Sequence, residues 1–502
     1  MNEALASLSG AAASPGGLLL PAAVLAPVVG VMAAFTLGGR NAQRVALALA
    51  PVNIVIAALI ASAVWRARAP IFYHVGGFAP PLGLSLRADG FSAVMLATSA
   101  LVMAAAHLFA RADFATPAGV AEARAPFAFW TLTQALSAAL AIVFLSADLF
   151  NLFVALELLT FAAVPLVCLK GSAETLRAAL RYLLFALIGS VLYLLGVTLL
   201  YGAYGTLDMA LLAERLRPAP IVYAAAALAT AGLLAKTALV PLHLWLPPAH
   251  ANAPAPASAI LSALVVKGSF FLIVRLWFDV FPALAAGAAS ALIAGLGCLA
   301  ILVGGTMALR QARLKPLIAY STVAQLGYLF LMFPLAVGGA PWAPDAWAGG
   351  VMQTLSHAFA KAGMFLAAGL VVEGLGHDRI ADLRGLGRAM PLAALTLGIG
   401  GLSLVGLPPS GGFMAKWLLL TSAAEAGFWP IVAMLLAGGL MAGAYVGRIL
   451  GPALATPAPP LRSRPHPLRG AAALALAVVA LLMGLAPLGF YDFLDIGRPL
   501  IP

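Results

Sequence analysis

The chain has 502 residues, of which 63% are hydrophobic and only 9% are charged, and its formal net charge is +11. Because a soluble domain carries about a quarter charged residues, this composition predicts a single polytopic membrane domain. A net positive charge can favour nucleic acid, but the basic residues here stand at the ends of apolar runs, as in loops that flank a bilayer. No nucleic-acid partner is therefore expected.

The first ten residues, MNEALASLSG, contain Glu3 and lack the basic start of a cleavable signal peptide, so no such signal is expected. Cys168 and Cys298 lie far apart in apolar runs, outside any CxxC or Cys/His cluster. They are interpreted as small buried hydrophobic residues. No metal site and no cofactor is expected.

Apolar segments of spanning length follow one another along the whole chain. A membrane crossing takes about 20 residues. Fourteen segments reach that length: 18–38, 43–65, 90–110, 127–147, 149–169, 176–204, 220–250, 255–278, 283–308, 315–336, 348–373, 391–424, 428–450 and 470–490. Internal prolines in 220–250 and 391–424 predict broken rather than tilted helices. Residues 66–90 alternate in polarity around a Gly/Pro turn, which predicts an outward-facing β-hairpin.

The distribution of Lys and Arg predicts the orientation of the chain. With the N-terminus outside, the inside loops hold 17 basic residues and the outside loops hold 7. Both termini are therefore expected on the periplasmic side of a bacterial inner membrane. This assignment places Arg275 in an outside loop and Lys315 and Arg469 in inside loops.

The remaining basic residues stand within the apolar segments, and all are lysines: Lys236, Lys267, Lys361 and Lys416. Arginine stays charged at physiological pH, whereas a desolvated lysine can lose its proton and can therefore relay protons. The alternative is that these long side chains snorkel to the interface. That alternative is easier for Lys236 and Lys416, beside the proline breaks, than for the two lysines near segment centres. Intramembrane ionisable residues are typical of ion pathways.

Residues 235–267, AKTALVPLHLWLPPAHANAPAPASAILSALVVK, combine two of these lysines with the first break, which His243 and His250 flank. Interrupted helices line binding sites in many transporters, so the stretch predicts part of a proton path. A metal ion is not expected, because neither cysteine nor carboxylate completes a ligand set. The second break precedes Lys416 five segments later, and an odd offset gives two copies opposite orientations.

Glu157 is the carboxylate nearest the centre of a segment, and Lys236 is its predicted partner. His357 stands four residues before Lys361, on the same helical face, and is either a relay or a satisfied core histidine. Asp148, before Asn151, is either a helix cap or part of the path. The other histidines are expected at the interface or in loops: His74, His107, His377 and His466. No nucleophile–base arrangement is present, so no active site is expected in the chain itself.

Several motifs resemble the antiporter-like subunits of respiratory complex I: ADLFNLFVALELL, AKTALVPLHLWLPPAHANAPAPASAILSALVVKGSFFLIVRL, LKPLIAYSTVAQLGYLF, SHAFAKAGMFLAAG and GLPPSGGFMAKWLLL. They are also similar to the D-type subunit of Mrp sodium/proton antiporters and to membrane subunits of group 4 hydrogenases. The resemblance implies an all-α polytopic fold with fourteen transmembrane helices, two inverted five-helix repeats, and broken seventh and twelfth helices. It divides the chain into N-terminal helices (1–126), a first repeat (127–278), a second repeat (283–450), and a cytoplasmic linker with the last helix (451–502).

The resemblance also implies roles for individual residues. Glu157 matches the glutamate of the fifth helix, and Lys236 and Lys267 match the lysines of the seventh and eighth helices. Lys416 matches the charged residue of the twelfth helix. The histidines at 243 and 250 match positions around the first break, and His357 and Lys361 match polar positions on the eleventh helix. Lysine at 416 is more similar to D-type and quinone-proximal members than to members with glutamate there.

The expected function is a proton-translocating subunit that works with other membrane subunits in the lipid bilayer, with Na⁺ as a further candidate ion. One alternative is an autonomous sodium/proton antiporter. Another is a non-redox subunit of a proton-pumping NADH:quinone oxidoreductase or membrane-bound hydrogenase. A third is the transmembrane partner of a soluble carbon-dioxide-hydrating protein, in which proton flow drives bicarbonate accumulation.

Overall fold

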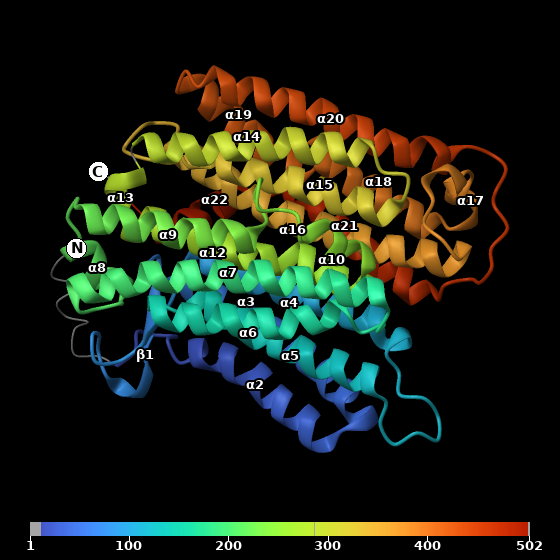
Figure 1. Ribbon diagram of the computed structural model, residues 1–502, viewed down its shortest axis with the longest axis horizontal. Helices are drawn as coiled ribbons and strands as arrows, with labels where there is room; N and C mark the ends of the chain where they lie inside the picture. The colour runs from blue at the N-terminus through green and yellow to red at the C-terminus, as the bar shows by residue number, and fades with distance from the viewer. Residues whose placement is uncertain (1–11, 286, 500–502) are drawn as a thin grey trace.

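The computed structural model describes residues 12–285 and 287–499 as a bundle of long helices with one small β-hairpin (Figure 1). Within these residues, twelve helices are long and apolar enough to cross a membrane. They are α2 (Leu19–Leu37), α3 (Gly39–Ala67), α4 (Gly90–Asp113), α5 (Arg124–Leu145), α6 (Leu149–Val167), α7 (Ala173–Tyr204), α9 (Pro220–Thr237), the continuous run Ala255–Val280, α14 (Ala288–Leu309), α16 (Ala343–Leu375), α20 (Trp429–Leu454) and α21 with its last turn (Pro467–Leu485).

The run Ala255–Val280 consists of α11 (Ala255–Ile260), a π turn η2 (Leu261–Val265), α12 (Val266–Arg275) and a second π turn η3 (Leu276–Val280). The shorter helices are α8 (Met209–Arg215), α10 (Leu246–Asn252), α13 (Pro282–Ala285), α15 (Leu314–Leu329), α17 (Leu386–Ala389), α18 (Pro391–Val405), α19 (Gly411–Glu425) and α22 (Leu488–Asp495). Short 3₁₀ turns are η1 (Val75–Gly77), η4 (Phe330–Met332), η5 (Ile380–Leu383) and η6 (Met483–Leu485).

The prediction of a polytopic helical membrane protein is confirmed, but the number fourteen stays a prediction. Segment 315–336 forms α15, which has only 16 residues before it tightens into η4. Segment 391–424 divides into α18 and α19, each of 15 residues. Neither segment is a single helix of spanning length, because the first changes its winding and the second contains the proline break.

The last predicted segment, 470–490, is wrong at both ends. Helix α21 begins earlier, at Pro467, and ends in η6 at Leu485. The separate helix α22 follows Pro487. Proline lacks a backbone N–H and disfavours helical geometry in the residue before it, which favours a helix end at this position.

The predicted hairpin is present within residues 66–90. Strands β1 (Ile71–His74) and β2 (Ser85–Ala88) pair antiparallel, with Ile71 opposite Ala88 and His74 opposite Ser85. The amide of Ser14 donates to the Phe72 carbonyl at 3.1 Å. The first described residues therefore lie at the hairpin end of the bundle.

The other end of the described chain returns to the same place. The amide of Gly90, two residues after β2, donates to the carbonyl of Ile496 at 3.0 Å. The chain therefore starts and finishes its path through the bundle at one end, as an even number of crossings requires.

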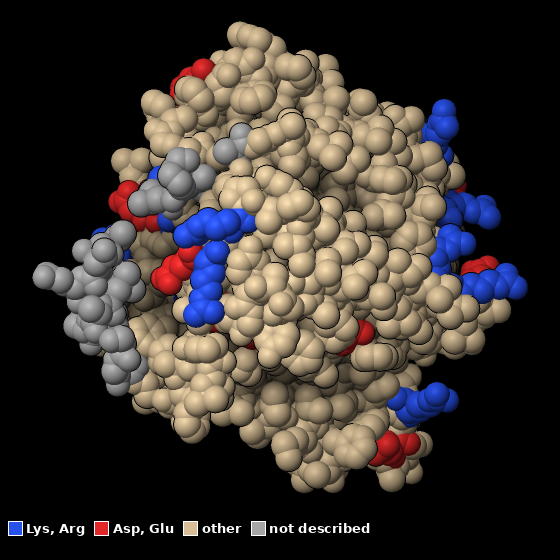
Figure 2. Space-filling view, turned by 60° about the vertical axis from the view of Figure 1, so that its left-hand side comes forward, with Lys and Arg blue, Asp and Glu red and all other residues tan. Residues whose placement is uncertain are grey.

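Lys and Arg gather towards the two ends of the bundle on the face shown in Figure 2, and a broad surface of other residues separates them. Large apolar side chains such as Phe35 and Ile188 are exposed on the outer helices. An exposed apolar surface of this extent is typical of a surface that contacts lipid or protein.

Glycines allow the helices to approach closely where they cross. A Cβ atom on Gly232 of α9 would lie 2.3 Å from the carbonyl oxygen of Gly189 in α7. Small residues at a crossing let helix backbones touch, which is how helices commonly associate in membranes. This contact positions α9, and with it Lys236, against the bundle.

Candidate functional site

The first predicted break is present between α9 and α10. Helix α9 ends at Thr237, Ala238 adopts a left-handed conformation (φ 60°), and α10 begins at Leu246. The indole of Trp245 donates to the carbonyl of Ala235 at 2.9 Å. A side chain of the break thus satisfies a backbone group freed at the helix end, as a non-aqueous environment requires.

The second predicted break is present between α18 and α19. Helix α18 ends at Val405, and Gly406 takes the left-handed conformation (φ 86°) that glycine adopts without strain. The ammonium of Lys416 donates to the carbonyls of Leu404, at 2.6 Å, and Val405, at 3.1 Å. A cation at the C-terminal end of a helix is favoured because the free carbonyls there carry partial negative charge.

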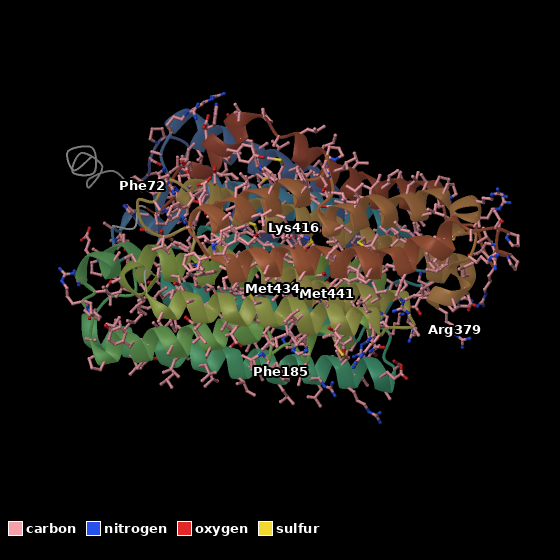
Figure 3. The ribbon with its side chains drawn as sticks, turned by 90° about the horizontal axis from the view of Figure 1, so that it is seen from above. Phe72, Phe185, Arg379, Lys416, Met434 and Met441 are labelled. Carbon is pink, nitrogen blue, oxygen red and sulfur yellow. The ribbon has the colours of Figure 1, made fainter. Side chains whose placement is uncertain are left out.

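Lys416 lies about midway along the long axis of the bundle. Figure 3 shows it between Phe72 of the hairpin, at one end, and Arg379, at the other. Its Nζ also lies 4.3 Å from the ring centre of Tyr328. These contacts hold the lysine inside the bundle, so it does not snorkel to an end.

The predicted ion pair between α6 and α9 is formed. Lys236 Nζ lies 3.3 Å from Glu157 Oε1 and donates to the hydroxyl of Thr160 at 2.9 Å. Ser190 of α7 donates a hydrogen bond to the same carboxylate oxygen. Lys236 is buried, whereas the Glu157 side chain is 18% exposed at the outer face of α6.

Lys267 is completely buried two residues after the π turn η2. Its Nζ donates to the carbonyl of Ser262, inside that turn. A π turn shifts the backbone hydrogen bonds by one residue, and such turns are frequent at functional sites. The hydroxyl of Ser262 lies 3.0 Å from that of Thr322 in α15, which links η2 to the second half of the chain.

Lys361 and His357 lie buried on one face of α16. Lys361 Nζ donates to the carbonyl of Ile318, at 3.0 Å, and to the hydroxyl of Ser321. Within the part of the chain that the structure describes, neither ring nitrogen of His357 has a hydrogen-bond partner. No protein group among the described residues satisfies this ring, and its role as a relay stays a prediction.

His357 lies within the electrostatic range of three lysines, namely Lys267, Lys361 and Lys416. These lysines come from α12, α16 and α19. Cations from three different helices therefore act on this one ring.

The two histidines of the first break have different surroundings. His250 of α10 is fully buried, its ring meets Phe365 edge-on at 5.6 Å between centres, and neither ring nitrogen has a partner among the described residues. The charges of Lys267 and Lys361 act on His250. His243 is buried in the segment between α9 and α10.

Uncharged polar residues that sequence analysis missed connect these groups. Gln353 of α16 donates to the side-chain oxygen of Gln325 at 2.9 Å, and Gln325 donates to the Leu404 carbonyl at 3.0 Å. Gln325 thereby shares an acceptor with Lys416. The sequence did contain a signal for them, namely two glutamines inside apolar segments, because a buried side-chain amide requires hydrogen-bond partners.

Three basic residues assigned to loops are instead buried, so that assignment is wrong for Arg275, Lys315 and Arg469. Each stands within a turn or so of a helix end, where a hydropathy average cannot separate a loop from a buried end. Arg275 pairs with Asp89, at 2.6 Å, and with Asp279, at 3.3 Å. Such a pair is retained only with good geometry, because burying two charges costs several kcal/mol per ion.

Asp89 lies just before α4, and its side chain accepts from the amide of Ser92 as the helix cap. Burial alone would raise the pKa of Asp89, but the guanidinium groups of Arg275 and Arg87 outweigh burial and hold the pKa below its ordinary value of 3.8. The cluster therefore stays ionised and ties α4 to the end of α12.

Two further predictions concern polar residues at other helix ends. Asp148 accepts from the amide of Asn151 at 2.8 Å, so the interpretation of Asp148 as a helix cap is confirmed. The interfacial position expected for His107 is wrong: its ring is buried and contacts the Thr133 hydroxyl at 3.0 Å. Among residues 12–285 and 287–499, no group of three or more His, Cys, Asp or Glu could hold a metal ion.

Known proteins share both the sequence and the fold. A family model described as "NADH:quinone oxidoreductase/Mrp antiporter, TM" matches residues 146–442. The N-type subunit of an NADH-quinone oxidoreductase from Desulforudis audaxviator is 36% identical over 428 residues, which are 83% of this chain and 80% of the relative. The D-type subunit of a Na(+)/H(+) antiporter from Alkalihalophilus pseudofirmus is 30% identical over 374 residues, 73% of each protein.

A protein in the structure of the Mrp complex from Dietzia sp. DQ12-45-1b superposes with a TM-score of 0.87, covering 97% of this chain and 98% of that one. Its sequence identity is 24%, so it shows the fold alone. The family model and the two sequence relatives carry the assignment further. On these matches, the chain belongs to the NADH:quinone oxidoreductase/Mrp antiporter transmembrane family.

Proposed function

We propose that this multi-pass membrane protein is the proton-translocating subunit of a multi-subunit complex. The observation that carries the proposal is a series of ionisable groups across the bundle, from the ion pair on α6 and α9 to the second break, all of them buried except the partly exposed Glu157. The series is Glu157, Lys236, Lys267, His250, Lys361, His357 and Lys416. Buried titratable groups inside a membrane bundle persist where ions move.

The ion pair of Glu157 and Lys236 acts as a switch in this proposal. While the pair is closed, the carboxylate holds the proton on Lys236. When a partner subunit draws Glu157 away, Lys236 releases its proton towards Lys267. A cavity of about 10 Å³ borders Lys236 and Ser269 and is about the size that one water requires.

The onward route runs through α16. His357, with both ring nitrogens free of hydrogen bonds among the described residues, accepts a proton from the Lys267 side. It passes the proton to Lys416, which loads or releases it at the second break. His243 lies in the first break and is proposed as a polar group lining the path rather than as a member of this series.

The proposed organisation has two inverted repeats, residues 127–278 and 283–450. The breaks between α9 and α10 and between α18 and α19 support it, because each repeat has one interrupted helix with a lysine beside it. Both termini are proposed to be periplasmic in a bacterial inner membrane. The excess of basic residues in the loops at the opposite end favours this orientation.

The test is proton transport by the purified native complex in sealed vesicles. Lys361→Met should reduce transport by roughly 100-fold, because positioned proton-transfer groups contribute that much or more. Arg181→Met, which removes an exposed cation on α7, serves as the control. Equal transport by wild type and Lys361→Met, at equal amounts of complex, would overturn the proposed path.

A more specific function is a non-redox subunit of a proton-translocating NADH:quinone oxidoreductase. The 36% identity with a subunit named for that enzyme favours it. Mass spectrometry of the native complex tests this assignment. Iron–sulfur subunits that oxidise NADH support it, whereas Mrp companions or a soluble carbon-dioxide-hydrating protein would replace it with the corresponding alternative.

A further inference from the structure

A cavity of about 450 Å³ opens at the end of the bundle opposite the hairpin. Its walls are the C-terminal ends of α4 and α16, the N-terminal ends of α15 and α21, and the segment between α10 and α11. Its charged lining residues are Asp113, Lys170, Arg313, Lys315, Glu373 and Arg469. The volume far exceeds the roughly 10–15 Å³ that one water needs, and the charged side chains of the lining favour water.

Ion pairs join the helix ends that line this cavity. Arg469 of α21 contacts Asp113 of α4 at 2.6 Å and also pairs with Glu373 of α16. One guanidinium therefore ties together the ends of three helices that form the wall. Its planar group of donors suits this bridging geometry better than a lysine would.

Lys315 lies between the cavity and the buried groups. It lines the cavity, yet only 6% of its surface is exposed. Its Nζ donates to the carbonyl of Ala253 at 2.5 Å. Ala253 directly follows α10, the helix that carries His250, and Ala251 and Ala255 on either side of it also line the cavity.

His250 lies beyond this wall. It is fully buried, and neither ring nitrogen has a hydrogen-bond partner in the described ranges. The charges of Lys315, Lys267 and Lys361 all act on it. His250 lies three residues before Ala253, whose carbonyl accepts the ammonium of Lys315, so the cavity-lining lysine contacts the end of the helix that carries this ring.

We propose that this cavity gives water access to the path from the inside face, and that Lys315 transfers protons between the cavity and His250. The ammonium of Lys315 gives a proton to a free ring nitrogen of His250, which becomes an imidazolium. The neutral amine then takes a proton from a hydronium ion in the cavity. This inference rests on the proposed function and adds to it the residue through which protons enter the path.

Lys315 could instead serve only to anchor the start of α15 to Ala253, and two substitutions separate the roles. Lys315→Arg keeps a cation and a donor but cannot release a proton at physiological pH. Lys315→Met removes both. A relay predicts that both variants of the native complex lose roughly 100-fold in proton transport, whereas recovery of wild-type transport in Lys315→Arg would overturn the inference.

The outcome for Lys361→Met in the same vesicles distinguishes this inference from the proposed function. Normal transport in the Lys315 variants, with Lys361→Met inactive, rejects the role of Lys315 and leaves the path in place. Normal transport in Lys361→Met rejects the path itself. Arg181→Met, whose exposed cation lies outside the cavity lining, again serves as the control for loss of charge.

Cysteine labelling tests the cavity without relying on the Lys315 variants. Ala251→Cys is made in a chain whose Cys168 and Cys298 are replaced by alanine, within the native complex. A membrane-impermeant thiol reagent should label it from the inside face and not from the outside face. Absence of labelling from the inside, or labelling from the outside alone, would overturn the water-access role.

Discussion

Replacing Glu157 with glutamine tests the switch most directly, because the change removes one charge and leaves the side-chain shape almost unaltered. Lys236 Nζ lies 3.3 Å from Glu157 Oε1. At that distance two opposite charges attract by about 5 kcal/mol in an effective dielectric of about 20. Removing one partner of a buried pair commonly costs about 3–5 kcal/mol.

The cost to stability should fall below that range. Lys236 still donates to the Thr160 hydroxyl at 2.9 Å, and the Glu157 side chain is 18% exposed, so water and protein replace part of the lost attraction. We expect a loss of about 1–3 kcal/mol, and the complex should still assemble. If the pair contributes about 3 kcal/mol to moving the proton from Lys236, transport should slow roughly 100-fold, since each 1.36 kcal/mol is tenfold.

The assay is quenching of a pH-sensitive dye in sealed vesicles that contain the native complex, normalised to the amount of this subunit. Glu425→Gln, which changes an exposed carboxylate at the end of α19, is the matched control and should transport normally. A Glu157→Gln complex that assembles and transports at the wild-type rate would refute the switch. Failure of the control would show that any carboxylate loss disturbs the complex.

Lys416→Arg should keep the contacts with the free carbonyls of the second break but lower transport roughly 100-fold, because arginine does not release its proton; vesicle transport at the wild-type rate would contradict this. Asp89→Asn should lower unfolding stability by about 3–5 kcal/mol, seen as a lower melting temperature, because its arginine partner stays buried. Since the folded pKa of Asp89 lies below its ordinary 3.8, its stabilisation is present above that pH and is lost as the pH falls further, so the wild-type melting temperature should drop there and that of Asp89→Asn should change less. Gly232→Val should reduce the amount of assembled complex by immunoblot, because a Cβ there meets the Gly189 carbonyl at 2.3 Å, while Gly202→Ala, with open space, should not.

Features that depend on local composition were predictable from the chain alone. Hydropathy summed over a window locates a span. The two breaks were predicted because prolines stand inside overlong apolar runs, and both are observed there, whereas Pro27, Pro51 and Pro165 lie inside the continuous helices α2, α3 and α6. The lysines at 267 and 361 stood out because charge is costly in the middle of an apolar run. Glu157 and Lys236 are 79 residues apart. Their pairing was predictable because a carboxylate in the middle of an apolar segment needs a cation, and the intramembrane cations are lysines.

Other features were decided by contacts between distant parts of the chain. A hydropathy window cannot distinguish a lysine in the first turn of a helix from a loop residue. Lys315 is buried, and its ammonium donates to a carbonyl 62 residues earlier in the chain. His107 and Arg275 were misplaced for the same reason, since burial at a helix end depends on which other helix covers it. Composition and periodicity therefore determined that this is a polytopic membrane protein with two interrupted helices and charged groups in its interior. Only the packing of the helices determined which of those groups meet and where water can reach them, because burial and electrostatic contact depend on distance in space rather than on separation along the chain.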